Sequence, residues 1–454
     1  MTATLSDPRR APRRPAEHRP RRPADADAAG RIPRHRTLNT PGSLRALLAA
    51  LVLLSLAWGA LGGWVASQHS SAAVALVSVD EPLSGDARQM FQSIADADVT
   101  ITSALLASSE PPLSETRRYE NDIKTAAGDL SQLRTAGGDQ AETAALDAFG
   151  TGLPVYNEDV AKSETSYALG FRLTGGSFLQ VASEEAHLVL LPNAKSVFTQ
   201  ENDALTAASS QATDLPTIIA ALVLAVITAF VLYRAQRWLA RRTNRMLSVG
   251  LMLTSVLLVG SALWLAAAFF AARSDLDHAI GQGSRPAAKL AQADIDVQQI
   301  RGDAVLNVIS RSGNTSFQDN FQTTSAQVGP GSGSLLSAAA AAQGGDGTGA
   351  SLIAAAEREA PAWYAANDSV YSQGHAAQYA EERTTVISSA AAAGYTALEG
   401  DITGAINADQ GVFTSTATSG AHALDPLESI VLVASLLMAL GCGWAFSRRL
   451  AEYR

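Results

Sequence analysis

Four stretches of the chain contain no charged residue and approach the roughly 20 residues that a helix needs to cross a bilayer. They are 46–65, 215–233, 246–272 and 429–446. The first could instead be a secretory signal peptide, but it follows a long polar tail and begins a pattern that recurs. We therefore predict four transmembrane helices, which we place at 46–67, 215–233, 246–272 and 429–447.

Apolar residues recur at helical spacing in the two long segments between these spans, 68–214 and 273–428. The stripes are Ala87, Met90, Ile94, Ala97, Ile101 and Ala104 in the first segment, and Leu290, Ala293, Val297, Ile300, Ala304 and Val308 in the second. Steps of three and four residues predict a buried seam along a long helix, and they do not fit the alternation of a strand.

Glycine and proline divide both segments into about four helices each. The breaks fall at 111–112 (Pro-Pro), 137–138 (Gly-Gly), 328–334 (VGPGSGS) and 344–349 (GGDGTG). We expect two up-and-down helical bundles that continue into the spans. A later helix should be kinked by Pro192, because proline removes a backbone donor and clashes with the preceding turn.

Phrases repeat between the two halves of the chain. IADADVTI at 94–101 corresponds to LAQADIDV at 290–297, and LPVYNED at 153–159 corresponds to APAWYAAND at 360–368. Each half also has the order span, long acidic segment, span. The predicted fold class is an all-α membrane protein with four transmembrane helices and two extracytoplasmic helical bundles related by internal duplication.

Charge sets the expected orientation. Residues 1–45, the link 234–245 and the end 448–454 together hold 19 of the 34 basic residues but only 5 of the 43 acidic ones. The remainder of the chain holds 15 basic and 38 acidic residues, a net charge of −23. By the positive-inside rule, both termini and the link are cytoplasmic in a multi-pass cell-membrane protein, and 68–214 and 273–428 face outward.

Catalytic and metal-binding motifs are not apparent in the sequence. The single cysteine, Cys442, rules out an intrachain disulfide, and the seven histidines have no helical pair that would bind zinc. The acidic residues of the repeated phrases are interpreted as a solvated helix face, with a catalytic carboxylate pair as the weaker alternative; they are Asp96, Asp98, Asp294 and Asp296. We expect no enzyme activity, no cofactor and no metal.

The short cytoplasmic pieces are candidates for partner contact. The arginines of the link are Arg234, Arg237, Arg241, Arg242 and Arg245, and they set topology, bind a partner, or do both. The tail 1–45 has eleven arginines and seven prolines, so we expect it to be disordered and drawn to anionic lipid or to an acidic partner. Nucleic acid is not an expected partner, and a homo-oligomer is an open alternative.

Small residues in two spans would allow their helices to approach closely, unless they only reflect the usual composition of membrane helices. They are Gly59, Gly62, Gly63, Gly441 and Gly443.

Two outer helical domains, four spans, an arginine-rich cytoplasmic tail and no output domain form an unusual layout. Each single module resembles the periplasmic four-helix sensor of chemoreceptors and histidine kinases. The whole layout, from the first span to the fourth, resembles the GlnX-like actinobacterial membrane signalling proteins. That resemblance implies a relay between an extracytoplasmic glutamate/aspartate-binding lipoprotein and the cytoplasmic Ser/Thr kinase PknG. It implies no specific site residues.

The function predicted from these features is a non-enzymatic transmembrane signal relay. An outer ligand or a ligand-loaded binding protein, for acidic amino acids by the resemblance, would bias helices that reach a cytoplasmic partner such as a Ser/Thr kinase. The alternative is a membrane scaffold or an accessory subunit of a transport or cell-envelope complex. A net charge of −23 disfavours direct binding of an acidic ligand, unless Arg117, Arg118 or Arg172 overrides it locally.

Overall fold

The computed structural model describes residues 40–108, 111–212, 214–243, 249–310, 315–329, 331–343, 347–376 and 378–450. Within these ranges every regular element is a helix, and four helices are long and apolar enough to cross a membrane. The all-α, four-span prediction is therefore confirmed. Most of the tail expected to be disordered, residues 1–39, lies outside the described part, as do Arg245 in the link and residues 451–454.

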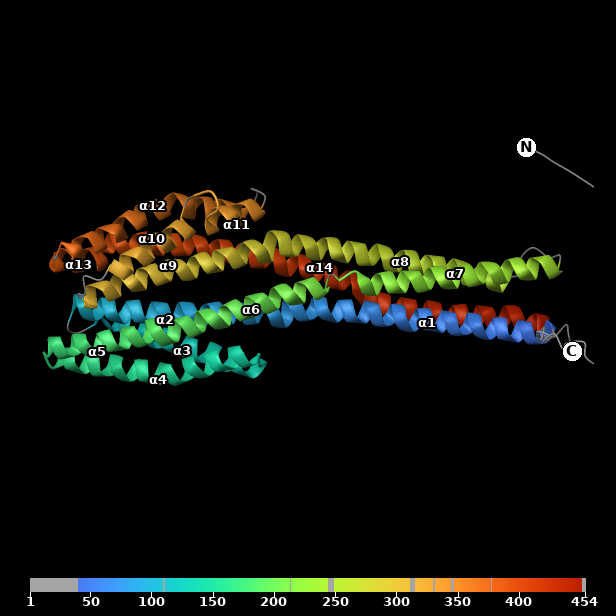
Figure 1. Cartoon of the computed structure of the whole chain (residues 1–454), viewed down its shortest axis with the longest axis horizontal. Coiled ribbons are helices and arrows are strands. Elements are labelled where there is room, and N and C mark those ends of the chain that lie inside the picture. The colour runs from blue at the N-terminus through green and yellow to red at the C-terminus, as the bar shows by residue number, and fades with distance from the viewer. Residues whose placement is uncertain are drawn as a thin grey trace, which may run out of the picture.

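The first half of the chain forms one span, a domain and a second span. Its helices are α1 (Thr40–Ala75), the π turn η1 (Leu76–Asp80), α2 (Glu81–Ala107), α3 (Leu113–Ala136), α4 (Gln140–Ala168), α5 (Arg172–Glu185), the π turn η2 (Ala186–Leu190), α6 (Leu191–Ala212) and α7 (Pro216–Thr243). The breaks predicted at 111–112 and 137–138 lie between α2 and α3 and between α3 and α4, so both are confirmed. The domain of the first half is a bundle of α2, α3, α4 and the α5–η2–α6 rod (Figure 1).

The second half repeats this order of span, domain and span. Its helices are α8 (Val249–Ala279), the π turn η3 (Ile280–Ser284), α9 (Arg285–Ser310), α10 (Thr315–Val328), α11 (Leu335–Gln343), α12 (Thr348–His375), α13 (Tyr379–Val386) and α14 (Ser389–Leu450). The glycine-rich stretches separate α10, α11 and α12 as predicted. At 62 residues, α14 is about 90 Å long, so it runs from the far end of the domain through the whole membrane bundle (Figure 1).

The spans form a four-helix bundle in which α1 and α8 each pack against both α7 and α14. Trp58 of α1 is fully buried there, and its indole Nε1 donates a hydrogen bond to Ser261 Oγ of α8 at 3.2 Å. Where the bundle meets the domains, an apolar collar joins α1, α6, α8 and α14; its largest members are Leu76, Leu205, Leu276 and Phe413. The membrane half and the domain half are thus packed together through this collar.

One hydrophobic core extends through both domains. All twelve side chains of the two predicted apolar stripes are buried, which confirms them as helix seams. Apart from Ala104 and Val308, the residues of both stripes belong to the same cluster of buried residues, together with side chains of α3, α4, α6, α12 and α14. Helices α2 and α9 lie against each other, so the two domains pack side by side (Figure 1).

A proline follows each of the three π turns by two residues. In the residue before it, Glu81, Leu191 or Arg285, the backbone N–H reaches the carbonyl five positions back. This wider turn lets the helix pass a proline, which cannot donate to the carbonyl four positions back. The kink that we expected at Pro192 is therefore a π turn, and Pro82 and Pro286 have the same arrangement.

The π turns also bear on the register of the predicted repeat. η3 begins 204 residues after η1, whereas the two opening phrases lie 196 residues apart. Both Pro154 and Pro361, in contrast, lie inside a long helix, α4 and α12, and are separated by 207 residues. Elements of the two halves thus correspond in order, while the opening phrases are about two helical turns out of step. The duplication itself stays a prediction.

Four of the five small residues singled out in the spans lie at close helix contacts. A Cβ built at Gly59 would overlap Ser435 Oγ, and one at Gly62 would lie 2.9 Å from Val431. Gly63 faces Leu432, and Gly441 faces Thr254 and the backbone of Gly250, but Gly443 has no such neighbour. Close packing of α1 against α14 therefore explains Gly59, Gly62 and Gly63, and close packing of α14 against α8 explains Gly441.

Gly250 and Gly260, both on α8, provide a matched test of this packing. A Cβ at Gly250 would lie 2.7 Å from the Gly441 carbonyl oxygen, whereas one at Gly260 meets nothing within 4 Å. We expect Gly250→Val to destabilise the full chain by about 1–3 kcal/mol, because backbone atoms cannot rotate away. Gly260→Val should change thermal stability in lipid nanodiscs by less than about 0.5 kcal/mol. Equal effects would contradict the described α8–α14 contact.

Candidate ligand site between the two domains

The acidic residues of the repeated phrases lie between the domains, not on a solvated face. Asp98, Asp294 and Asp296 are 1%, 0% and 4% exposed, and only Asp96 is partly accessible. The expectation of a solvated face is therefore wrong for these residues. The reason is that α2 and α9 pack against each other, so Asp96, Asp294 and Asp296 meet side chains of the other domain. Asp98 instead faces Tyr156, Ser183 and His187 of its own domain.

Two of the buried carboxylates are met by side chains from the first domain. Arg88 Nη1 of α2 lies 3.8 Å from Asp294 Oδ2, and the Gln92 amide donates a hydrogen bond to the same carboxylate. On α6, Lys195 Nζ lies 3.0 Å from Asp296 Oδ1. Burial raises the pKa of Asp294 to about 7, although the charge of Arg88 opposes this shift. These pairs tie α9 to the first domain.

A buried histidine links one carboxylate from each domain. His187, in the π turn η2, places Nε2 3.5 Å from Asp98 Oδ2 and Nδ1 3.3 Å from Asp303 Oδ1. Ser183 and Asn320 also donate hydrogen bonds to Asp98 and Asp303, at 2.9 Å and 2.6 Å. Burial alone would lower the pKa of His187, but hydrogen bonds and charges from both carboxylates raise it to about 9. The histidine is therefore cationic at neutral pH.

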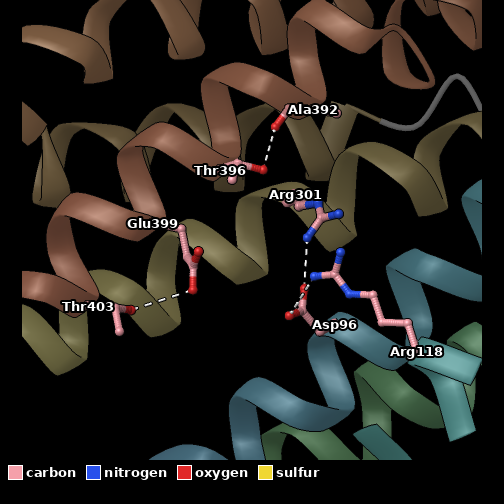
Figure 2. Close-up of polar contacts among 7 residues, drawn as sticks. All are labelled: Asp96, Arg118, Arg301, Ala392, Thr396, Glu399 and Thr403. Atoms are coloured by element: carbon pink, nitrogen blue, oxygen red, sulfur yellow. Dashed lines mark hydrogen bonds and ion pairs between the residues drawn. The ribbon is translucent and has the colours of Figure 1, made fainter. Parts of the chain in front are cut away.

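Two guanidinium groups share one carboxylate at the end of α2 and α9 that is farther from the spans. Asp96 Oδ1 accepts from Arg301 Nη1 of α9 at 2.9 Å, and Asp96 Oδ2 accepts from Arg118 Nη2 of α3 at 3.2 Å. Figure 2 shows both guanidinium groups next to this carboxylate. Arg301 also lies over the ring of Tyr395, 3.9 Å from its centre. The cluster carries one positive charge in excess of its carboxylate.

A cavity of about 400 Å³ lies beside this cluster and is lined by both domains. Arg118, Arg301 and Glu115 are its charged lining residues, and Trp363 and Tyr395 are its aromatic ones. Hydroxyl and amide groups add polar lining, from Thr100, Ser103, Asn367, Thr385 and Thr396. A volume in the range of small-molecule sites, with a few convergent polar groups, is typical of a ligand pocket.

Tyr395 has a buried hydroxyl that is left unpaired within the described part of the chain. Its side chain is 4% exposed and lines the cavity, and its Oη has no hydrogen-bond partner among the described residues. An unpaired buried hydroxyl is costly, so such groups commonly face water or a ligand. Nearby Glu399 of α14 has a raised pKa, chiefly through burial and then through the charge of Asp96, while Arg301 and Arg118 lower it (Figure 2).

The candidate arginines of the link are elsewhere, at the opposite end of the molecule. The link is not a separate loop, because α7 continues to Thr243. Arg234, Arg237 and Arg241 are exposed at spacing that places them on one face of α7, and they line a shallow groove with Tyr233 and Trp238. Arg237 also donates to Tyr233 Oη at 3.0 Å. Nothing is described of the Arg242 side chain or of Arg245.

The sequence analysis identified one of the key residues at the cavity and between the domains, and it missed the others. Of the three arginines considered for an acidic ligand, Arg118 lines the cavity, whereas Arg117 and Arg172 do not. Arg301, His187 and Tyr395 were not singled out. Arg301 directly follows Ile300 of an apolar stripe, but this position does not show which helix the side chain faces. The sequence gives no comparable signal for His187 or Tyr395. Among the described residues, no group of His, Cys, Asp or Glu side chains is arranged to hold a metal ion.

The contact between the domains should weaken as pH rises. His187 has a folded-state pKa of about 9 against an ordinary 6.5, so its stabilising contribution is complete below pH 6.5 and is lost as pH rises through 9. Asp294 also has a raised folded-state pKa, about 7, so its contribution to the free energy of unfolding likewise falls as pH rises from about 4 to 7. We expect the free energy of unfolding to fall by roughly 1–3 kcal/mol between pH 6.5 and 9.5.

Thermal unfolding of the full chain in nanodiscs, followed across this pH range, measures that loss. His187→Gln is the diagnostic variant, because it should flatten the slope between pH 6.5 and 9 while leaving the slope at lower pH. An unchanged profile in His187→Gln would show that other groups dominate the pH dependence.

A family model described as an actinobacterial sensor domain matches residues 72–210. The match extends from the last turn of α1 to α6, so it covers the first domain and no part of the second. No curated protein and no solved structure matches the chain. A similarity to sensor domains of actinobacteria is thereby confirmed for the first domain and indicates a sensing role, while the closer relation to GlnX-like proteins stays a prediction.

Proposed function

We propose that the chain is a non-enzymatic transmembrane signal relay. Its domain half faces outward and responds to a ligand or to a ligand-loaded binding protein. The response passes through the spans to a cytoplasmic partner. The resemblance of the overall layout to GlnX-like proteins supports acidic amino acids as the signal, a solute-binding lipoprotein as the outer partner and a Ser/Thr kinase as the inner one.

Continuous helices carry this proposal. The rods α1–η1–α2 and α8–η3–α9 run without a non-helical break from the spans to the seam between the domains, and α14 does so in a single helix. The fourth connection differs, because α6 and α7 are separate helices with a break before Pro216. A helix that is packed at both ends moves as a unit, so a shift of α2 against α9 would reach the far end of the membrane bundle.

The π turns add a place where such a shift can occur. η1 and η3 lie next to the collar that joins the spans to the domains, and both lack the regular hydrogen-bond ladder of an α-helix. Such turns are frequent at functional sites. Ligand binding can bias the helices only through different affinities for two arrangements, and the seam between α2 and α9 is where two arrangements would differ in ion pairing.

The basic face of α7 is the proposed binding surface for the cytoplasmic partner. Arg234, Arg237 and Arg241 project from the same exposed face beyond the apolar part of the helix. Three guanidinium groups on a rigid helix suit an acidic protein surface. Orientation by the positive-inside rule places this face in the cytoplasm.

A membrane scaffold or accessory subunit is the second candidate function. It is favoured by an apolar tip at the turn between α4 and α5, where Leu169, Phe171 and Leu173 are 67%, 63% and 88% exposed. Exposed apolar groups that cluster in this way commonly mark contact with another protein. A scaffold would bind through the tip without any response to a small molecule.

Co-purification of the tagged full chain from cells grown with and without glutamate separates the two candidates. For the relay, we expect a secreted solute-binding protein and a cytoplasmic kinase, with recovery that depends on glutamate. Replacing the three arginines of the α7 face by Gln should reduce kinase recovery by roughly tenfold or more, and replacing them by Lys should retain most of it. Recovery of envelope or transport components alone, unaffected by glutamate, would contradict the relay and favour the scaffold.

A further inference from the structure

We propose that the cavity between the domains binds a small organic carboxylate, whose carboxylate group is held by Arg118 and Arg301. This inference rests on the proposed sensing function and deepens it, since it names a site in the chain itself and the class of ligand. It does not require a binding protein. The argument starts from the guanidinium groups.

The two guanidinium groups have spare hydrogen-bonding capacity beside the cavity. Each has five N–H donors, and Asp96 engages one nitrogen of each. A planar carboxylate is the ligand group that matches this geometry best, because guanidinium binds it through parallel hydrogen bonds. Since Arg118 comes from the first domain and Arg301 from the second, a ligand carboxylate between them would bridge the domains.

The two guanidinium groups and a helix N-terminus attract an anion at this point, against the charges of Glu115 in the lining and of Glu399 nearby. Helix α14 begins at Ser389, and Ala391 and Ala392 of its first turn line the cavity. Backbone N–H groups at a helix N-terminus add positive potential to that of the guanidinium groups. The carboxylate of Asp96 already neutralises part of this positive charge, so an incoming carboxylate would compete with Asp96 for the two arginines. The average negative charge of the outer segments therefore does not exclude an acidic ligand.

The remaining lining fits an apolar body with a hydrogen-bonding group. Trp363 and the ring of Tyr395 offer flat apolar surface, and Val99, Val305 and Val370 add aliphatic surface. The unpaired Tyr395 Oη offers a hydroxyl that a polar ligand atom would satisfy. A cavity of about 400 Å³ accommodates a ligand of roughly 10–20 non-hydrogen atoms.

Binding would also act on the contact between the domains. Asp96 is the only carboxylate bonded to both arginines among the described residues, so competition for either arginine changes an ion pair across the seam. The domains would then be held together by the ligand as well as by the protein. This places the ligand at a point from which α2 and α9 can be shifted.

The test uses the full chain in nanodiscs of zwitterionic lipid. The probes are succinate, L-glutamate and phenylacetate at 10 mM, each compared with its primary amide at the same concentration. We expect at least one carboxylate to raise the melting temperature by roughly 2 °C or more when its amide does not. Titration calorimetry of that carboxylate then gives the dissociation constant.

Arg118→Gln and Arg117→Gln are the matched variants. Arg118 is about half exposed, so its removal leaves Asp96 paired with Arg301, while Arg117 is exposed on the same helix and does not line the cavity. Arg118→Gln should raise the dissociation constant at least tenfold, about 1.4 kcal/mol. Arg117→Gln, with the same change in net charge, should keep it within about twofold.

Two results would overturn the assignment. One is that none of the carboxylates differs from its amide. The other is that a carboxylate binds equally well to both variants, which would locate it outside this cavity. If either occurs while recovery of the inner partner still depends on glutamate, this site fails and the relay stands. A carboxylate that binds as expected without any effect on partner recovery would support the site and contradict the relay.

Discussion

Pairing of buried charges along the seam between α2 and α9 is the constraint on which the arrangement of the two domains depends. Four ionic contacts join α9 to the first domain, and three of them involve a carboxylate of α9 that is at most 5% exposed. A buried charge without a partner is strongly unfavourable, so displacing either helix by one turn would leave several charges unmatched at once. The apolar stripes supply most of the buried surface, but apolar side chains would still pack together if α2 were displaced along α9. The ion pairs would not re-form after such a displacement. The seam therefore fixes the register of the domains.

This register has consequences for the whole length of the molecule. The helices that form the seam are the same helices that continue into the membrane bundle, through π turns that accommodate a proline. Glycines at the contacts with α14 then hold the spans at close range. The cavity lies at one end of these rods and the basic face of α7 lies at the other, so the two proposed contact points are joined by packed helices. The relay depends on that continuity.

Much of the fold could be predicted from the sequence, because helical seams and bilayer-length apolar stretches are local patterns. The stripes on α2 and α9, the breaks between helices and most of the close-packing glycines were found in this way. The contact partners of the polar residues could not be predicted from the sequence, because Asp98 and Asp294 look the same there whether they face water or another helix. The second span was predicted to end at residue 233, where the arginines begin, but α7 continues to Thr243, because charged residues end an apolar span without ending a helix. For the cavity, only Arg118 was considered beforehand, and its counterpart Arg301 comes from a segment nearly two hundred residues away.

Distance measurement by electron–electron resonance tests most directly whether the seam is coupled to the spans. With Cys442 replaced by serine, one pair of spin labels at Thr143 and Ser351 reports on the two domains, and a second pair at Ala49 and Val256 reports on α1 and α8 within the membrane. All four positions are exposed. Asp96→Asn removes the charge that the two arginines share. The account predicts that this one change shifts or broadens both distance distributions. A change between the domains with no change between α1 and α8 would contradict it.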